Sequence, residues 1–82
     1  MDYKEFLQNK INKIHTTKLG EVRIRKNLHL TVEDVVDFCK KLIIDPDNII
    51  EKCGKNFYVK NNNVTLTINS YSFTIITAHI NY

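Results

Sequence analysis

The sequence lacks the signatures of most familiar enzyme classes. It contains no phosphate-binding loop, no GxGxxG dinucleotide motif and no GxSxG nucleophile motif. Its three histidines and two cysteines do not fall at the spacing of metal ligands, and no CxxC pair is present. We therefore expect no metal, no cofactor and no nucleotide-driven chemistry.

Long apolar runs are missing as well. No stretch approaches the roughly 20 apolar residues of a membrane-spanning helix. The first residues include Asp2 and Glu5 and lack the apolar run of a secretory signal. Cys39 and Cys53 are expected to be reduced thiols. These absences predict a cytoplasmic domain with no membrane partner.

Negative charge is missing from the last third of the chain. Residues 54–82 hold two lysines and no acid, residues 1–30 hold seven basic residues against three acidic ones, and residues 31–53 hold three against six. The net charge of +3 therefore hides a dipolar distribution. Such a surface suits an anionic partner such as RNA, although solvated helix faces produce much the same pattern.

The 82 residues are enough for a single domain. Helical periodicity predicts three helices, over residues 3–14, about 18–27 and about 31–43. Leu19 and Val22 are expected on the inner side of the second helix. Thr31 begins a capping-box-like start of the third. Pro46 ends that helix, because proline cannot donate a backbone hydrogen bond.

After the proline, the pattern changes to that of strands, which we predict over residues 48–53, 56–60, 64–69 and 71–80. Short connections between them give an antiparallel meander. We predict an α+β domain in which two to three N-terminal helices cover one face of a four-stranded sheet. In the last strand, alternation places Ile76 and Ala78 toward the helices, and Thr77 and His79 on the opposite face.

Two polar groups near the N-terminus are candidates for a site. His15 precedes two threonines and a basic helix, where an imidazole can act as an acid or base beside a phosphate. Arg23, Arg25 and Lys26 supply cations that can bind phosphate. Arg23 and Arg25 are about 200° apart around the helix, so only one of them can reach a given ligand. An exposed junction and a solvated helix face are the alternatives.

The outer face of the sheet is the third candidate. Thr65, Thr67 and Asn69 are expected to share this face with Thr77 and His79. RNA cleavage without a metal needs an acid, a base and a cation near the phosphate, with the ribose 2′-OH as the nucleophile. The candidate catalytic residues are His15, His79 and Lys55. The candidate phosphate- or RNA-binding residues are Arg23, Arg25, Lys26, Thr77, Asn69 and Tyr58. A merely polar outer face is the alternative.

Four runs resemble a small bacterial family classed only as a domain of unknown function. They are HTTKLG from His15, RIRKNL from Arg23, GKNFYV from Gly54 and TINSYSFTIITAH from Thr67. The resemblance covers about residues 14–80 and implies no established activity.

The predicted layout consists of a basic helix preceded by His15, a helix that ends at Asp45-Pro46-Asp47, and a meander that closes on Ile76-Thr77-Ala78-His79. This layout is similar to that of the barnase, EndoU, colicin-nuclease and RelE group of metal-independent ribonucleases. That likeness implies that His15, Arg23, Lys55 and His79 meet over the sheet, with Thr77 in support. We therefore predict RNA binding or metal-independent RNA cleavage, of a toxin or phage type. The alternative is a non-catalytic protein-interaction domain, with a second copy as one such partner. Convergence of His15 and His79 on one cation would favour the enzyme.

Overall fold

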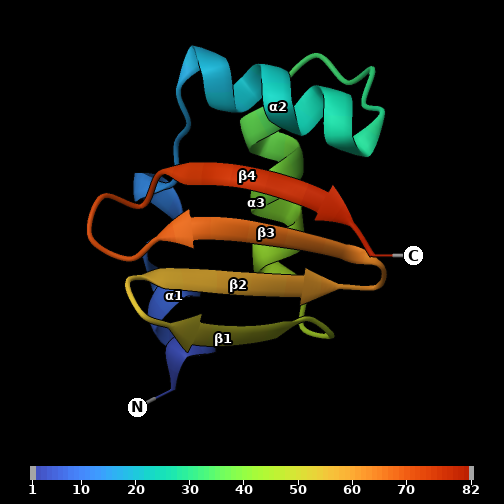
Figure 1. The fold of residues 1–82 in the computed structure, drawn as a ribbon. Helices are drawn as coiled ribbons and strands as arrows, with labels where there is room; N and C mark the ends of the chain where they lie inside the picture. The colour runs from blue at the N-terminus through green and yellow to red at the C-terminus, as the bar shows by residue number, and fades with distance from the viewer. Residues whose placement is uncertain (1, 82) are drawn as a thin grey trace.

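The computed structural model describes residues 2–81 and arranges four strands in front of a layer of helices (Figure 1). The elements are α1 (Tyr3–Asn9), a 3-10 helix η1 (Ile11–Lys13), α2 (Lys18–Leu28), α3 (Val35–Ile44), β1 (Ile49–Cys53), β2 (Asn56–Asn61), β3 (Val64–Asn69) and β4 (Ile75–Ile80). The strands form one antiparallel meander in the order β1-β2-β3-β4. The predicted α+β class is confirmed.

Several boundaries follow from local chemistry, as predicted. The side-chain oxygen of Thr17 caps α2 by accepting a hydrogen bond from the backbone of its first turn. α3 ends just before Asp45 and Pro46. The β1–β2 and β2–β3 turns contain Gly54 and Asn62, both with left-handed φ angles, of 61° and 54°. These residue types adopt that conformation at low cost.

Two predicted helices have different bounds. The helix expected over residues 3–14 stops at Asn9, and a short 3-10 helix follows it. The third helix does not start at Thr31. Asp34 is its cap and accepts a hydrogen bond from the backbone nitrogen of Asp37 at 3.0 Å. An aspartate next to the first helical residue therefore replaces the predicted capping box.

The inner side of α2 differs from the prediction. Leu19 and Val22 are exposed, at 59% and 61% of their surface. Gly20, Ile24 and Leu28 are buried instead. Their spacing of four residues places these three on one side of the helix, and that side packs against the rest of the protein.

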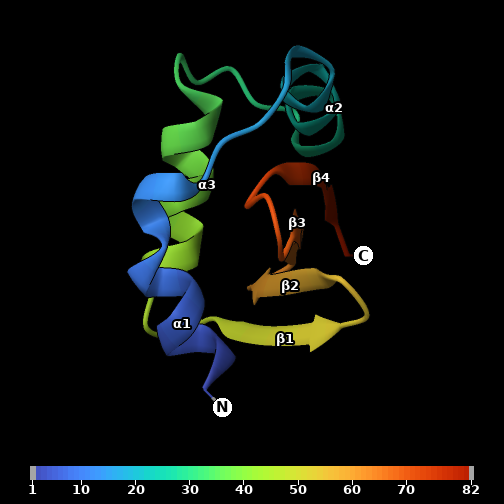
Figure 2. The ribbon, with the colours of Figure 1, turned by 90° about the vertical axis from the view of Figure 1, so that its left-hand side faces the viewer.

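The sheet has a covered face and an open face. α1 and α3 lie against the covered face, and α2 lies along the outer edge of β4 (Figures 1 and 2). The core lies between these elements and consists mainly of Leu7, Ile14, Ile24, Val35, Cys39, Ile43, Phe57, Val59, Leu66, Ile68, Ile75 and Ala78. The open face turns away from the helices and is turned toward the viewer in Figure 1.

A β-bulge in β4 changes which residues face the core. The register pairs on either side of it are Thr67 with Thr77 and Ile68 with Ile75. Ile76 is therefore an extra residue in its strand. The prediction that Ile76 faces the helices is wrong: Ile75 is fully buried, whereas Ile76 is half-buried and lies outside the core cluster. Ala78 lies on its predicted side, and so do Thr77 and His79, because they follow the bulge.

Cys39 and Cys53 are both free thiols. Cys39 is buried on α3, and the loss of solvent raises the pKa of its thiol to about 12. Cys53 is exposed at the end of β1. Within residues 2–81, no helix has both the length and the apolar content that crossing a bilayer requires.

Candidate functional site

Polar side chains form rows across the open face of the sheet. The register places Tyr58, Thr67 and Thr77 in one row, and Lys60, Thr65 and His79 in the next. The two central threonines, Thr67 and Thr65, are only 9% and 5% exposed although no helix covers this face (Figure 2). The hydroxyl of Thr65 accepts a hydrogen bond from the side-chain amide of Asn81 at 2.6 Å. Tyr58, Lys60, Thr77 and His79 form the more accessible layer.

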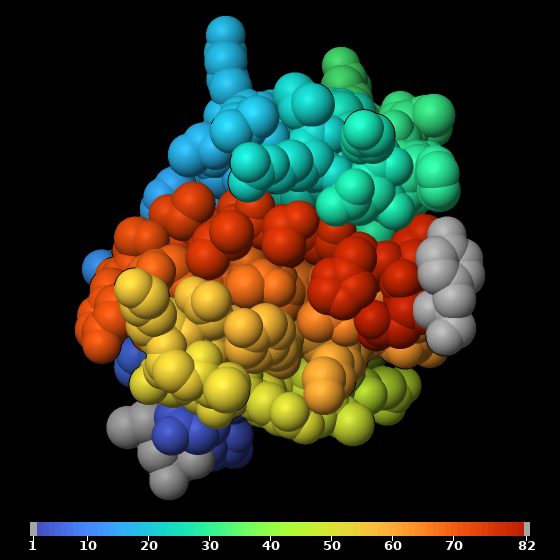
Figure 3. All heavy atoms as spheres, viewed as in Figure 1, coloured from blue at the N-terminus to red at the C-terminus, as the bar shows by residue number. Residues whose placement is uncertain are grey.

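α2 extends this surface beyond β4. The side-chain amide of Asn27 donates to the backbone oxygen of Ala78 at 3.0 Å and to the hydroxyl of Thr77 at 3.4 Å. Thr77 belongs to the open face, so Asn27 marks the side of α2 that borders that face. Arg23 lies one turn before Asn27 on the same side of the helix. Arg23 and Lys26 are both exposed, and Figure 3 shows α2 lying beside β4 in the view of the open face.

Arg25, the third predicted cation of α2, is engaged elsewhere. Its guanidinium donates to the backbone oxygens of Val32 at 2.5 Å and Glu33 at 2.9 Å, and pairs with the carboxylate of Glu21 at 3.3 Å. These contacts fasten the end of α2 to the segment before α3. Arg23 and Arg25 therefore point in different directions, as predicted, and Arg25 has a structural role. Of the three predicted cations of α2, Arg23 and Lys26 remain available beside the open face.

One acid lies on the open face. Glu51 stands opposite Tyr58 in the register, and its carboxylate contacts the ammonium group of Lys60 at 3.3 Å. Both side chains are about half exposed, so the pair contributes at most about 1 kcal/mol to stability. An anionic ligand can therefore compete with Glu51 for Lys60 at little cost.

The predicted catalytic histidines do not meet. His15 forms an isolated bridge with Thr74, before the start of β4, whereas His79 lies near the end of that strand. His79 is five residue steps from Thr74 along an extended strand, which corresponds to roughly 15 Å. A single phosphate cannot contact both imidazoles over that distance, so the paired acid–base arrangement is not supported.

His15 is instead part of a hydrogen-bonded chain at the loop before β4. Its Nδ1 donates to the backbone oxygen of Lys13 at 2.8 Å, and its Nε2 is hydrogen-bonded to the hydroxyl of Thr74 at 3.0 Å. That hydroxyl also contacts Ser72 Oγ at 2.8 Å. Lys55 lies at this end of the sheet, because its backbone oxygen accepts from Ser70. Lys55 is therefore near the His15 end and far from His79.

Asn69, a predicted RNA contact, organises the same loop. Its side-chain oxygen accepts from the backbone nitrogens of Tyr71 and Ser72, both at 2.9 Å, and from Ser72 Oγ at 3.3 Å. The side chain thus holds the β3–β4 connection. An asparagine side chain that bonds the backbone two residues later is typical of such a turn, so the asparagine itself was a signal available in the sequence.

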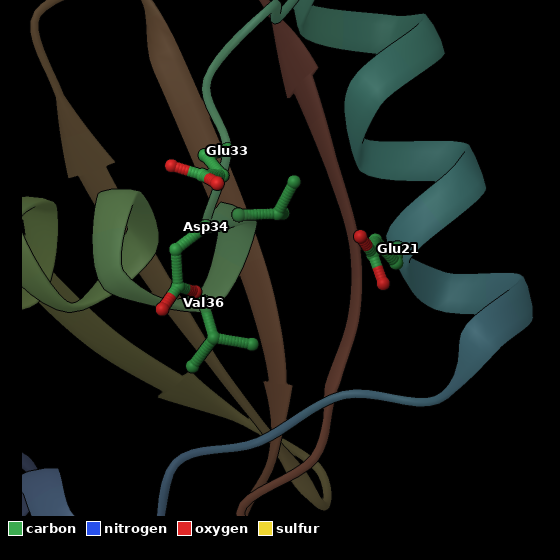
Figure 4. A pocket seen from close by; sticks show the side chains of 5 residues that line it. Glu21, Glu33, Asp34 and Val36 are labelled. Carbon is green, nitrogen blue, oxygen red and sulfur yellow. The ribbon is translucent and has the colours of Figure 1, made fainter.

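A pocket of about 400 Å³ lies between α2 and the start of α3 (Figure 4). Its lining includes the carboxylates of Glu21, Glu33 and Asp34. Glu21 is bound by Arg25, and Asp34 caps α3, so two of the three acids have structural partners. Among the described residues, no group of three or more potential ligands is arranged to hold a metal ion.

These features define an α+β domain with an open sheet face that is rich in hydroxyl groups and is bordered by cations. The chain belongs to the family described as "Protein of unknown function (DUF3781)", which it matches over residues 8–79. No curated protein and no solved structure matches it. The likeness to the ribonuclease group therefore has no support from a known structure.

Proposed function

We propose that the protein binds single-stranded RNA across the open face of the sheet and the adjoining side of α2. The observation that carries the proposal is the juxtaposition of Tyr58, Thr77 and His79 on an uncovered face with Arg23 and Lys26 along its border. Single-stranded nucleic acids are commonly bound by a cationic surface that follows the backbone and by an aromatic ring that stacks on a base.

Each part of this surface has a distinct task. Arg23 and Lys26 neutralise phosphates, and Lys60 exchanges Glu51 for a phosphate oxygen. Tyr58 provides the ring on which a base stacks. The hydroxyl of Thr77 and the imidazole of His79 can bond to base edges or to the ribose 2′-OH, which distinguishes RNA from DNA.

We propose that the protein binds RNA and that His15 and His79 do not cleave it as an acid–base pair. Cleavage by paired general acid and base requires both groups within hydrogen-bonding distance of the reacting atoms. His15 and His79 lie at opposite ends of β4, and the side chain of His15 is hydrogen-bonded to the backbone of Lys13 and to Thr74, just before β4. RNA incubated with the protein in excess chelator is therefore expected to remain intact.

The test measures the binding of a short labelled single-stranded RNA by fluorescence anisotropy over a range of salt concentrations. Loss of two phosphate contacts in the double variant Arg23→Ala/Lys26→Ala should lower the slope of log affinity against log salt by about 1.4. Lys40→Ala/Lys41→Ala is the matched control, because it removes the same charge from α3, behind the sheet. That control should leave the slope nearly unchanged.

A second arm tests the aromatic platform. Tyr58→Ala should weaken RNA binding at least about fivefold, and Tyr58→Phe should retain most of it, since stacking depends on the ring. If Arg23→Ala/Lys26→Ala and the control Lys40→Ala/Lys41→Ala reduced the salt slope equally, the result would contradict the proposed surface. RNA binding that is absent even at low salt would favour the alternative, a protein-interaction domain, for which the exposed Leu19 and Val22 on α2 are available.

A further inference from the structure

A second pocket, of about 330 Å³, lies at the end of the sheet where α1 meets the β-turns. Its lining is largely aromatic and consists of Tyr3, Phe6, Lys52, Phe57, Ser70 and Tyr71. Phe57 forms the buried base of the pocket. It is 2% exposed, and its ring packs against Tyr3 and Phe6 at centroid distances of 6.0 and 6.1 Å. The cavity is in the size range of small-molecule sites.

Tyr71 lies at this pocket with 79% of its surface exposed, the highest value among the large apolar side chains of residues 2–81. Its backbone is nevertheless tightly held. Its amide donates to the side chain of Asn69, and Ser70 donates to the backbone oxygen of Lys55 at 2.8 Å. An exposed ring on a rigid loop loses little conformational entropy when it stacks on a ligand.

The loop also contains backbone strain. Phe73 has a φ of 59°, a left-handed conformation that is costly for a bulky residue. Two backbone bonds fix the residue: its nitrogen donates to Asn69 at 2.9 Å, and its oxygen accepts from His15. The ring of Phe73 packs at 6.3 Å from that of Phe6, which lines the pocket. The surrounding contacts thus maintain a strained loop that presents Tyr71 and Ser70 to the cavity.

The charge of the lining selects the type of ligand. Lys52 is the one charged residue among the six, and none of them is acidic. The ammonium group of Lys10 also lies 5.6 Å from the centroid of Phe6. An aromatic cage for a cationic ligand would not place lysines beside its rings, because like charges repel. A flat ring with an attached anionic group matches both the aromatic walls and the charge.

We propose that this pocket binds a planar aromatic anion, with the ring stacked on Tyr71 above Phe57 and the anionic group bound by Lys52 and Ser70. The site is separate from the open sheet face. It also differs from our expectation of no nucleotide cofactor, which rested on the absence of phosphate-binding loops. Ring recognition by aromatic side chains needs no such loop.

The test titrates the full chain with adenosine monophosphate and, separately, with adenosine, by calorimetry. Saturable binding of the monophosphate is expected. Tyr71→Ala should weaken it at least about fivefold through loss of stacking, and Tyr71→Phe should restore it. Lys52→Ala should weaken the monophosphate about two- to fivefold and leave adenosine unchanged, because only the phosphate contacts the ammonium group. Circular dichroism checks that each variant is folded.

Tyr58→Ala separates this site from the RNA surface. It should weaken RNA binding and leave binding of the monophosphate unchanged. Equal loss of both ligands in Tyr58→Ala would show that the monophosphate occupies the open face, and would overturn the pocket proposal. Absence of saturable binding, or wild-type binding by Tyr71→Ala, would overturn it as well, without affecting the RNA proposal.

Discussion

The two outer edges of the sheet are protected in different ways. Along β4, the hydroxyl of Thr16 donates to the backbone oxygen of Ile75 at 2.8 Å, and Asn27 donates to that of Ala78 at 3.0 Å. Thr16, just before the cap of α2, and Asn27 within α2 thus supply donors that a fifth strand would otherwise provide. β1 is only five residues long and carries exposed charges on Glu51 and Lys52. Shortness and charge both oppose pairing with a foreign strand.

The β4 edge is protected by long-range contacts, whereas the β1 edge is protected by its own residues. The contacts along β4 join residues 59 and 51 positions apart in the chain, so they exist only when the fold is complete. The charges of β1 belong to the strand itself. Substitutions along the β4 edge should therefore cost more stability than those near β1.

The largest effect is expected at Ile75, which is fully buried beneath this edge. Ile75→Ala should lower the free energy of unfolding by about 2–5 kcal/mol, because it removes buried methyl groups and leaves a cavity. The matched change Ile76→Ala removes the same atoms from a half-buried position outside the core and should cost less than half as much. Urea unfolding measures both. A larger loss for Ile76→Ala would contradict the bulge.

Gly20→Val should have the next largest effect. A Cβ atom at this position would lie 3.2 Å from the backbone oxygen of Ile75 and would displace the hydroxyl of Thr16. Either α2 moves away from β4 or the bond from Thr16 is lost, at a cost of about 1–3 kcal/mol. Lys26→Val is the control on the exposed side of α2 and should change stability by about 0.5 kcal/mol or less. Similar thermal melts for the two variants would contradict close packing at Gly20.

Asn27 should contribute less, because it is exposed and only its amide contacts β4. Asn27→Ala should cost about 0.5–1.5 kcal/mol through loss of hydrogen bonds. Asn27→Asp keeps the size of the side chain but places a carboxylate against the oxygen of Ala78, and should cost at least as much. An aspartate variant with wild-type stability in urea would show that the amide is not the contact that matters.

A feature of the fold was predictable from the sequence when neighbouring residues determine it, and was not when distant contacts do. The helix–strand order, the stop at Pro46 and the turns at Gly54 and Asn62 follow from residue types with strong backbone preferences. The register that places Thr77 and His79 on the open face follows from alternation. The bulge at Ile76 does not, because a strand of branched apolar residues gives no sign of one extra residue until its partner is known.

The candidate site was also predictable only where its position depends on local sequence. Alternation placed the polar residues of the open face together, since strands joined by short turns pair in order. The separation of His15 from His79 and the capture of Arg25 depend on where α2 docks, and that is set by contacts across the whole chain. The aromatic pocket combines α1 with two distant turns and has no local signal.

The smallest effect is expected at the β1 side, where Asp45 joins the end of α3 to the sheet. Its carboxylate accepts from the backbone nitrogen of Asp47 at 2.8 Å and from the side chain of Asn61 at 3.0 Å. These bonds, first that from Asp47 and then that from Asn61, lower the pKa of Asp45, and the positive charge of Lys4 adds to the effect. The ionised form is therefore favoured in the folded protein.

The sign of the pH dependence follows from this lowered pKa. Stabilisation by Asp45 is fully present above the pKa of the unfolded chain, near 3.9, and is lost as the pH falls through the folded value. Asp45→Asn should therefore be less stable than the wild type at neutral pH, and the difference should shrink in acid. Asp47→Asn removes the same charge from the same turn, keeps the bonds of Asp45, and should give a smaller difference. Urea unfolding from neutral to acidic pH measures both, and a difference for Asp45→Asn that grows in acid would contradict the assigned role.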